Sequence, residues 1–238
     1  MKVLSYGGGL QTTALAVLVH QGRVQVDEAI FSDTGGEKPE TYWYMESYIK
    51  PLLGEIGVPL TTVRNELKAC QPDLYGWLWK HGQIPSLGGL RLCSIKYKRE
   101  TIERHLKGVK YETLVGFSLD ERVRADKFPE NTYPLIDLGL TSNDCRHIIS
   151  NFGLPQPLKS SCFYCPFQHP VEWNWLKNNH PDLFQKALDL EAHYHERRPD
   201  MRDFGLVRGV PLRRLKEGIQ PEMFQTVESA CWSGACGH

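Results

Sequence analysis

Cysteines at close spacing carry the clearest chemistry in this sequence. Cys162 and Cys165 are separated by two residues, a spacing found in zinc sites, iron–sulfur sites and redox dithiols. A thioredoxin-like dithiol needs a strand before its first cysteine and a helix that starts there, whereas prolines flank this pair on both sides. The pair therefore predicts a loop that carries metal ligands.

Cys93 is the natural third thiolate. It lies where a loop enters a helix rich in lysine and arginine. Arg91, Lys96 and Lys98 are near enough in sequence to lower the pKa of its thiol and to balance the charge of a metal cluster. Cys145 lies in an apolar helical stretch, where a cysteine is more often a buried apolar residue than a ligand.

A glycine-rich turn, Gly7-Gly8-Gly9, stands between a short apolar run and an apolar helix. Backbone N–H groups and the positive end of the helix dipole converge at such a turn, where they bind phosphate. Glycines allow the turn geometry and leave no side chain in the way of an anion, while Ser5 and Thr12 add hydroxyl donors. The turn matches neither a Walker loop nor a dinucleotide fingerprint, and the alternative is an ordinary tight turn.

Two further segments follow expected strands and could also meet a nucleotide. Arg122 and Arg124 come shortly after Gly116. A guanidinium group can donate two parallel hydrogen bonds to the oxygens of one phosphate. Asp33 and Gly35 follow the second strand. The alternatives are a solvated surface for the arginines and a turn or helix-capping role for Asp33.

The chain ends in Cys236-Gly237-His238. A cysteine on an exposed tail beside a histidine can act as a nucleophile, because the imidazole lowers the pKa of the thiol. The alternative is a terminal cysteine without a catalytic role.

The segments that must position these residues alternate between strand and helix. Apolar and β-branched runs predict strands at residues 2–5, 28–32, 60–63 and 111–115. Helices are expected at residues 12–20, 39–54, 94–106 and 145–151. This alternation predicts an α/β fold with a doubly wound, mostly parallel sheet, which binds ligands outside the carboxyl ends of its strands.

The last third of the chain changes character. Prolines become frequent, and two short helices are expected at residues 171–178 and 182–195. We therefore expect an α/β domain over residues 1–158 and a cysteine-bearing helical C-terminal subdomain with a tail over residues 159–238.

Composition narrows the class of protein. The 28 basic and 28 acidic side chains balance, so nothing in the total charge suggests a protein that coats a polyanion. No apolar run approaches the length of a membrane helix and no leader is recognisable, so we expect no membrane partner and a cytoplasmic location. In that reducing compartment the seven cysteines favour metal or thiol chemistry over disulfides.

The glycine turn resembles the pyrophosphate-binding loop of the phosphoadenosine-phosphosulfate (PAPS) reductase and ATP-pyrophosphatase superfamily, written Ser-Gly-Gly-x-Asp-Ser. In this sequence Gly7 replaces the first serine, Gln11 stands at the aspartate and Thr12 at the final serine. The resemblance implies an adenine nucleotide alpha hydrolase-like fold and a phosphate site that has lost one carboxylate.

Other stretches extend the resemblance in the family's order. Residues 31–35 with 39–42 resemble its Asp-Thr-Gly and Pro-Glu-Thr block, residues 116–122 its glycine, serine and arginine segment, and residues 133–137 its Pro-Leu pattern. The resemblance implies that an adenine nucleotide, either ATP or PAPS or adenylylsulfate, is bound by Ser5, Gly7, Gly8, Gly9, Gln11, Thr12, Asp33, Thr34, Gly35, Gly116, Arg122 and Arg124.

Residues 91–96 resemble the cysteine and basic segment that, with a later Cys-x-x-Cys, holds an iron–sulfur cluster in adenylylsulfate-reducing members. Leu92 stands where cluster-binding relatives have an adjacent cysteine, so three ligands remain: Cys93, Cys162 and Cys165. A [4Fe-4S] cluster held in this way keeps one iron open for sulfur. The alternative is a Zn²⁺ site completed by Cys145 or a tail cysteine.

Two activities follow from the resemblance. In the first, ATP activates an acceptor, pyrophosphate leaves with the help of Mg²⁺, and sulfur is transferred. The partners that this activity implies are a sulfur donor protein and a nucleic-acid acceptor. In the second, Cys236 attacks the sulfur of PAPS or adenylylsulfate and thioredoxin resolves the product, with Arg122 beside the nucleotide in either case. A nucleotide-sensing module of a larger assembly is the alternative that is not an enzyme. The first activity is favoured.

Overall fold

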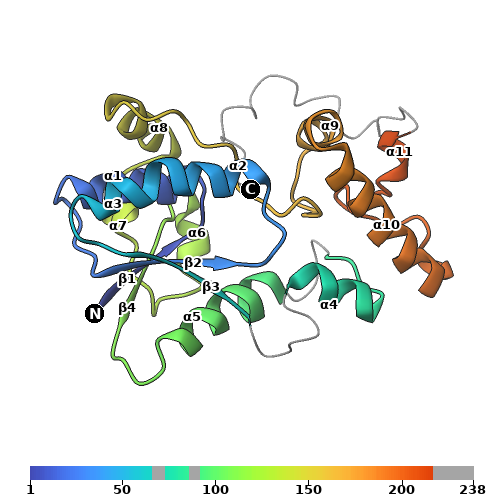
Figure 1. Ribbon diagram of the computed structural model, residues 1–238, viewed down its shortest axis with the longest axis horizontal. Coiled ribbons are helices and arrows are strands. Elements are labelled where there is room, and N and C mark those ends of the chain that lie inside the picture. Colours follow the sequence, from blue (N-terminus) through green and yellow to red (C-terminus); the bar gives the residue numbers. More distant parts are fainter. Residues whose placement is uncertain (66–72, 86–91, 217–238) are drawn as a thin grey trace.

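The computed structural model describes residues 1–65, 73–85 and 92–216. Its centre is a four-stranded, all-parallel sheet (Figure 1). The strands are β1 (Lys2–Tyr6), β2 (Glu28–Asp33), β3 (Leu60–Arg64) and β4 (Glu112–Val115), in the order β3-β2-β1-β4. The predicted α/β class and parallel pairing are confirmed, and each predicted strand begins and ends within a residue or two of the observed one.

Helices connect the strands and continue after them. They are α1 (Leu10–His20), α2 (Pro39–Tyr44), α3 (Lys50–Gly54), α4 (Leu74–His81), α5 (Glu100–His105), α6 (Arg122–Ala125), α7 (Pro134–Asp137), α8 (Ser142–Asn151), α9 (Pro170–Asn179), α10 (Pro181–Arg197) and α11 (Arg213–Lys216). Short π-helical segments, Met45–Ile49 and Cys93–Arg99, lead into α3 and α5, so the predicted helices 39–54 and 94–106 are observed as composite ones. Short 3₁₀ turns lie at Leu119–Glu121 and Pro199–Met201.

Both faces of the sheet are covered by helices. Successive strand residues point to opposite faces, so Leu4 packs in the core under α1, α3 and α8, whereas Val3 packs in the core formed with Ile102 and Leu106 on the side of α5. Figure 1 shows α1 and α8 on one side of the sheet and α5 on the other. The fold is therefore doubly wound.

The strand order places a topological switch point beside β1. From β1 the chain moves outward through β2 to β3, and it later adds β4 on the opposite side of β1. The turns after β1 and β4 therefore lie side by side at the carboxyl edge, where ligands bind in sheets of this kind. Gly116, after β4, keeps the two turns close, since a Cβ there would lie 2.8 Å from Thr12 Cγ2 and 3.1 Å from the Thr12 nitrogen.

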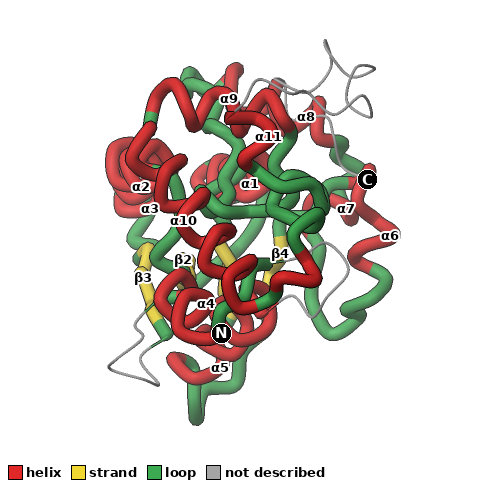
Figure 2. The backbone as a smooth tube through the Cα atoms, turned by 90° about the vertical axis from the view of Figure 1, so that its right-hand side faces the viewer, coloured by secondary structure: helices red, strands yellow, loops and turns green. Residues whose placement is uncertain are grey.

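A second hydrophobic core lies beyond one end of the sheet. Trp173, Leu176, Ala187 and Leu190 are fully buried in it, contributed by α9 and α10. Figure 2, viewed from that side, shows α4, α9, α10 and α11 in front of the strands. Because α4 joins this core from the first half of the chain, the predicted boundary after residue 158 stays a prediction.

No helix in the described ranges is long and apolar enough to cross a membrane.

Candidate nucleotide and thiol site

The glycine turn leaves the start of α1 open. Gly9 is the N-cap of this helix and has no side chain with which to accept the first backbone N–H groups. These donors, together with the positive end of the helix dipole, face the carboxyl edge of the sheet. Gly8 has φ +72°, and a Cβ there would lie 2.6 Å from Thr41 Cγ2 on α2. The turn therefore has the geometry of an anion site and needs glycine at position 8.

Polar side chains around this turn differ in how they are engaged. Thr12 Oγ1 donates to the Gly9 carbonyl at 3.2 Å, and Gln11 Nε2 donates to Ser142 Oγ at 3.4 Å. Ser5 lies within β1 and, by strand alternation, on the same face as Val3. The roles predicted for Ser5, Gln11 and Thr12 toward a nucleotide stay predictions.

The two arginines after β4 lie on the four-residue helix α6. The Arg124 guanidinium stands over the Phe117 ring, 4.4 Å from its centroid, and pairs with Glu121. Arg122 is exposed. Their predicted contact with phosphate stays a prediction.

Asp33 is buried and forms an ion pair at the carboxyl ends of β2 and β3. The parallel register places it opposite Arg64, whose Nε and Nη2 donate to Asp33 Oδ2 at 2.9 and 2.6 Å. Its Oδ1 accepts from the Gly35 nitrogen at 2.7 Å and from the Tyr42 hydroxyl at 2.6 Å. With four donors, this carboxylate is only 1% exposed yet fully satisfied. It therefore acts at the site by orienting Arg64 and Tyr42.

The pKa values of Arg64 and Tyr42, the two side chains that donate to Asp33, follow from this arrangement. The hydrogen bond and the charge of Asp33 raise the pKa of Arg64. Burial, followed by the hydrogen bond to Asp33, raises the pKa of Tyr42. Tyr42 is therefore a neutral hydroxyl donor and Arg64 a fixed cation.

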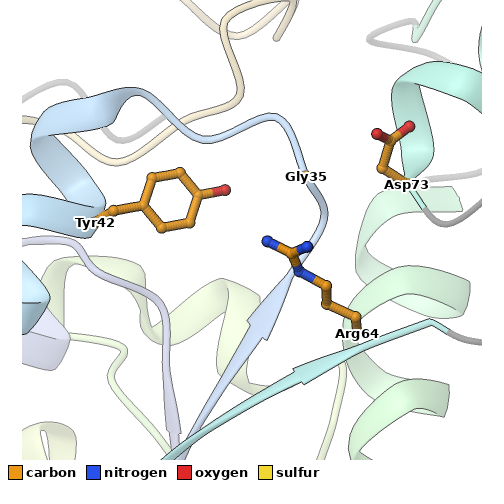
Figure 3. A pocket seen from close by; sticks show the side chains of 4 residues that line it. All are labelled: Gly35, Tyr42, Arg64 and Asp73. Atoms are coloured by element: carbon orange, nitrogen blue, oxygen red, sulfur yellow. The ribbon is translucent and has the colours of Figure 1, made fainter.

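A cavity of about 340 Å³ opens over this ion pair, lined by Gly35, Tyr42, Arg64 and Asp73. Figure 3 shows Tyr42 and Arg64 pointing toward one another, with Asp73 on the far side of the Gly35 turn. The described lining combines a cation, a carboxylate and a phenol, which suits a polar ligand.

One short segment joins the phosphate turn to the thiols. Ser160 Oγ donates to the Gly7 carbonyl at 2.6 Å. Two residues later, Cys162 Sγ lies 3.1 Å from Thr34 Oγ1, and the backbone of Cys162 forms an antiparallel bridge with Glu37. The predicted nucleotide residue Thr34 is thus in contact with a predicted metal ligand.

The three predicted ligands, Cys93, Cys162 and Cys165, share one electrostatic environment. Burial raises the pKa of the Cys162 thiol, and the nearby Glu37 raises it further. Burial also raises the pKa of Cys165 to about 11, with smaller contributions from Cys93 and Glu37. Desolvation lowers the pKa of Lys98, but Glu37 and the three cysteines together outweigh it, so the pKa is raised. A lysine and a carboxylate therefore stand among the three thiols.

These residues fit an iron–sulfur group in chemical type. Thiolates are the ligands such clusters prefer, and Lys98, whose pKa is raised, supplies positive charge beside them. Glu37 Oε2 is buried and has no hydrogen-bond partner among the described residues. Within the same residues, no three His, Cys, Asp or Glu side chains are placed to hold a metal ion. The ligand set therefore stays a prediction.

Cys145 does not belong to this group. It is fully buried in the core under α1, and burial raises its pKa to about 12. Its predicted role as a buried apolar residue is confirmed, and the alternative in which it completes a zinc site is wrong, because it packs among core side chains. Arg91 and the predicted nucleophile Cys236 lie outside the described residues.

Sequence reasoning missed several residues of the site. Arg64 directly follows the strand predicted at residues 60–63, at the ligand-binding edge, and this position was a usable signal. Lys38 is 1% exposed, and its nitrogen stands 5.7 Å from the centroid of the Trp175 ring; burial lowers its pKa. Ser160 contacts a residue 153 positions away, a contact that no local pattern reveals.

No family model and no curated protein matches this chain. Among solved structures, the chain is similar to the U34-tRNA thiolase NcsA from Methanococcus maripaludis with its [4Fe-4S] cluster, at 16% sequence identity and a TM-score of 0.47, over 99% of this chain and 80% of that chain. A match at this level carries no conclusion about function.

Proposed function

We propose that this protein is an adenine-nucleotide-binding enzyme of the PAPS reductase and ATP-pyrophosphatase superfamily, which uses ATP to activate an acceptor for sulfur transfer. One observation carries the proposal: Ser160 contacts the glycine turn, and Cys162, two residues later, contacts Thr34. The anion site and the thiols are therefore parts of one site.

The first step belongs to the glycine turn and the start of α1. An acceptor oxygen attacks the α-phosphorus of ATP, a new phosphorus–oxygen bond forms, and the bond to the bridging oxygen of the β-phosphate breaks. Pyrophosphate leaves with the negative charge, which the open N–H groups after Gly8 and the helix dipole stabilise. Arg122 and Arg124 are proposed to meet the remaining phosphate charge, with Mg²⁺ as the counter-ion.

The second step is substitution at the activated acceptor. A sulfur nucleophile, supplied as sulfide or by a sulfur donor protein, attacks the acceptor atom, and the bond to the adenylated oxygen breaks with release of AMP. Held by Cys93, Cys162 and Cys165, an iron–sulfur cluster would supply an iron with an open position for sulfur. Lys98, whose pKa Glu37 and the three cysteines raise, supplies positive charge at this end of the site. A nucleic acid is the acceptor proposed here.

The assay compares the products of three nucleotides. Protein purified without oxygen is incubated with sulfide, bulk tRNA and ATP, PAPS or adenylylsulfate, and pyrophosphate and sulfite are measured. We expect pyrophosphate from ATP. Arg122→Ala should slow its release by an amount equivalent to about 1.5–3 kcal/mol, the cost of one charge-assisted contact. Arg23→Ala, at another exposed arginine, is the matched control and should change nothing.

The reductase alternative makes the opposite forecast for Cys236. If that thiolate attacks sulfur, Cys236→Ser loses turnover, because a hydroxyl is a much poorer nucleophile at neutral pH. In the proposed function the same variant keeps ATP-dependent pyrophosphate release. Sulfite release that wild type performs and Cys236→Ser abolishes would replace the proposal with a sulfonucleotide reductase.

A further inference from the structure

The cavity over the Asp33–Arg64 pair contains a second carboxylate whose position is fixed. Asp73 is the N-cap of α4 and accepts from the Gly76 nitrogen through Oδ1 at 2.7 Å. The next residue, Leu74, donates its backbone N–H to the Thr34 carbonyl at 3.0 Å. Gly35 packs so closely against Asp73 that a Cβ at position 35 would lie 2.3 Å from Asp73 Cβ. The carboxylate therefore has a defined place in the cavity wall.

The charges of the described lining, Arg64 and Asp73, balance, and Asp33 beneath them adds one negative charge. The cation of Arg64 is neutralised by Asp33, which takes two of its donors. The charge of Asp73 remains, and it lies within electrostatic reach of the guanidinium. The hydrogen bonds of Asp73 use Oδ1 and those of Arg64 use Nε and Nη2, so Asp73 Oδ2 and Arg64 Nη1 have no partner among the described residues. Within the described lining, the cavity thus offers one acceptor and one donor, with no surplus positive charge.

The cavity lies within reach of a nucleotide bound at the glycine turn. Neighbouring strands are about 4.8 Å apart, so the carboxyl end of β3 stands about 10 Å from that of β1, the distance over which a nucleoside extends from its 5′-phosphates. Asp33 and Gly35 lie between the two ends, on the turn after β2. A nucleotide that crosses this turn brings its sugar to the cavity.

From these observations, and resting on the proposed function, we infer that the cavity receives the sugar of the nucleotide and that Asp73 makes the site selective for an unphosphorylated 3′ position. A ribose hydroxyl can donate to the carboxylate and accept from Arg64. A 3′-phosphate brings about two negative charges and no donor, so it is repelled by Asp73 and finds a guanidinium already neutralised. The substrates of this site are therefore ATP or adenylylsulfate, and PAPS is excluded.

The test uses AMP and adenosine 3′,5′-bisphosphate, which differ only in the 3′-phosphate. Calorimetry on the full chain should give AMP binding at least about tenfold tighter. Asp73→Asn removes the charge and keeps the helix cap, because asparagine caps as well as aspartate. In this variant the preference should fall to about threefold or less.

Two further variants complete the experiment. Asp73→Ser also keeps a capping side chain and should lose the preference as Asp73→Asn does. Asp203→Asn removes an aspartate whose side chain is 91% exposed, and it should keep the wild-type preference. Binding of the bisphosphate as tightly as AMP by wild type, or a preference that survives in both Asp73 variants, overturns the inference and leaves the proposed function standing. Failure of ATP and AMP to bind at all overturns both.

Discussion

Gly8 and Gly9 are neighbours in the phosphate turn, but the fold depends on them to different degrees. Gly8 has φ +72° and faces Thr41 on α2. A side chain at this position would therefore be strained both by the positive φ and by the contact with Thr41. Gly9 has φ −101°, and the nearest atom to a Cβ there would be Ser160 Cβ at 3.9 Å, an ordinary contact. The missing side chain at position 9 therefore leaves the N–H groups at the start of α1 accessible, and the backbone conformation does not require it.

We expect Gly8→Ala to lower the free energy of unfolding by about 1–3 kcal/mol, because alanine resists a positive φ and would collide with Thr41. Gly9→Ala should change it by less than about 1 kcal/mol. Urea denaturation followed by circular dichroism measures both. Equal stability of the two variants would show that the turn does not require a left-handed residue at position 8.

Arg64 is expected to matter for stability because its partner is buried. Replacing it by methionine leaves Asp33 with two donors instead of four, in a place that is 1% exposed. Since the arginine side chain itself is 61% exposed, we expect a loss of about 2 kcal/mol, below the range for a fully buried pair. Arg23→Met, at an exposed site, is the control. A loss in Arg64→Met no larger than in the control would mean that solvent replaces the guanidinium.

At the scale of elements, α10 holds the chain segment that follows it. Glu191 is 2% exposed and accepts from the backbone nitrogens of Leu206 at 2.8 Å and Leu212 at 2.7 Å. Burial raises its pKa, and the hydrogen bonds from these nitrogens only partly oppose the shift. The folded state thus binds a proton at Glu191 more tightly than the unfolded state does.

The sign of the pH dependence follows from that difference. The tighter proton binding at Glu191 stabilises the folded state fully at pH values below the unfolded pKa of glutamate, about 4.3. This stabilisation is lost as the pH rises through the raised pKa of the folded state. Glu191→Gln has no such loss, so its free energy of unfolding should improve relative to wild type between pH 4 and pH 7. Glu130→Gln, at an exposed glutamate, should run parallel to wild type. A difference for Glu191→Gln that stays constant with pH would contradict the raised pKa.

The elements themselves could be predicted because their signals are local. Apolar and β-branched runs predict strands that the structure confirms, and the helix predicted at residues 145–151 is observed as α8, which opens with a capping box between Thr141 and Asp144. Contacts across the fold carried no such signal. The register that pairs Asp33 with Arg64 depends on sheet order, and the packing of α4 on α10 depends on which apolar faces meet. The site was therefore predicted in its residue types and only partly in its contacts.

At the scale of the whole molecule, the thiols stand where the sheet meets the second core. Cys93 and Cys162 pack against that core, while Thr34 and Glu37 reach Cys162 from the end of β2. The phosphate turn is connected to the same place through Ser160. A nucleotide bound at the phosphate turn should therefore alter the surroundings of an iron–sulfur cluster held by the three cysteines.

The most direct test of this single-site account is the electron paramagnetic resonance spectrum of anaerobically reconstituted, reduced protein with and without saturating ATP. We expect an iron–sulfur signal that changes when ATP is added and that is lost in Cys93→Ala, Cys162→Ala and Cys165→Ala. Cys145→Ala should retain the signal, since that cysteine lies in the core under α1. A signal that ATP leaves unchanged, or colourless protein with stoichiometric zinc, would contradict the account.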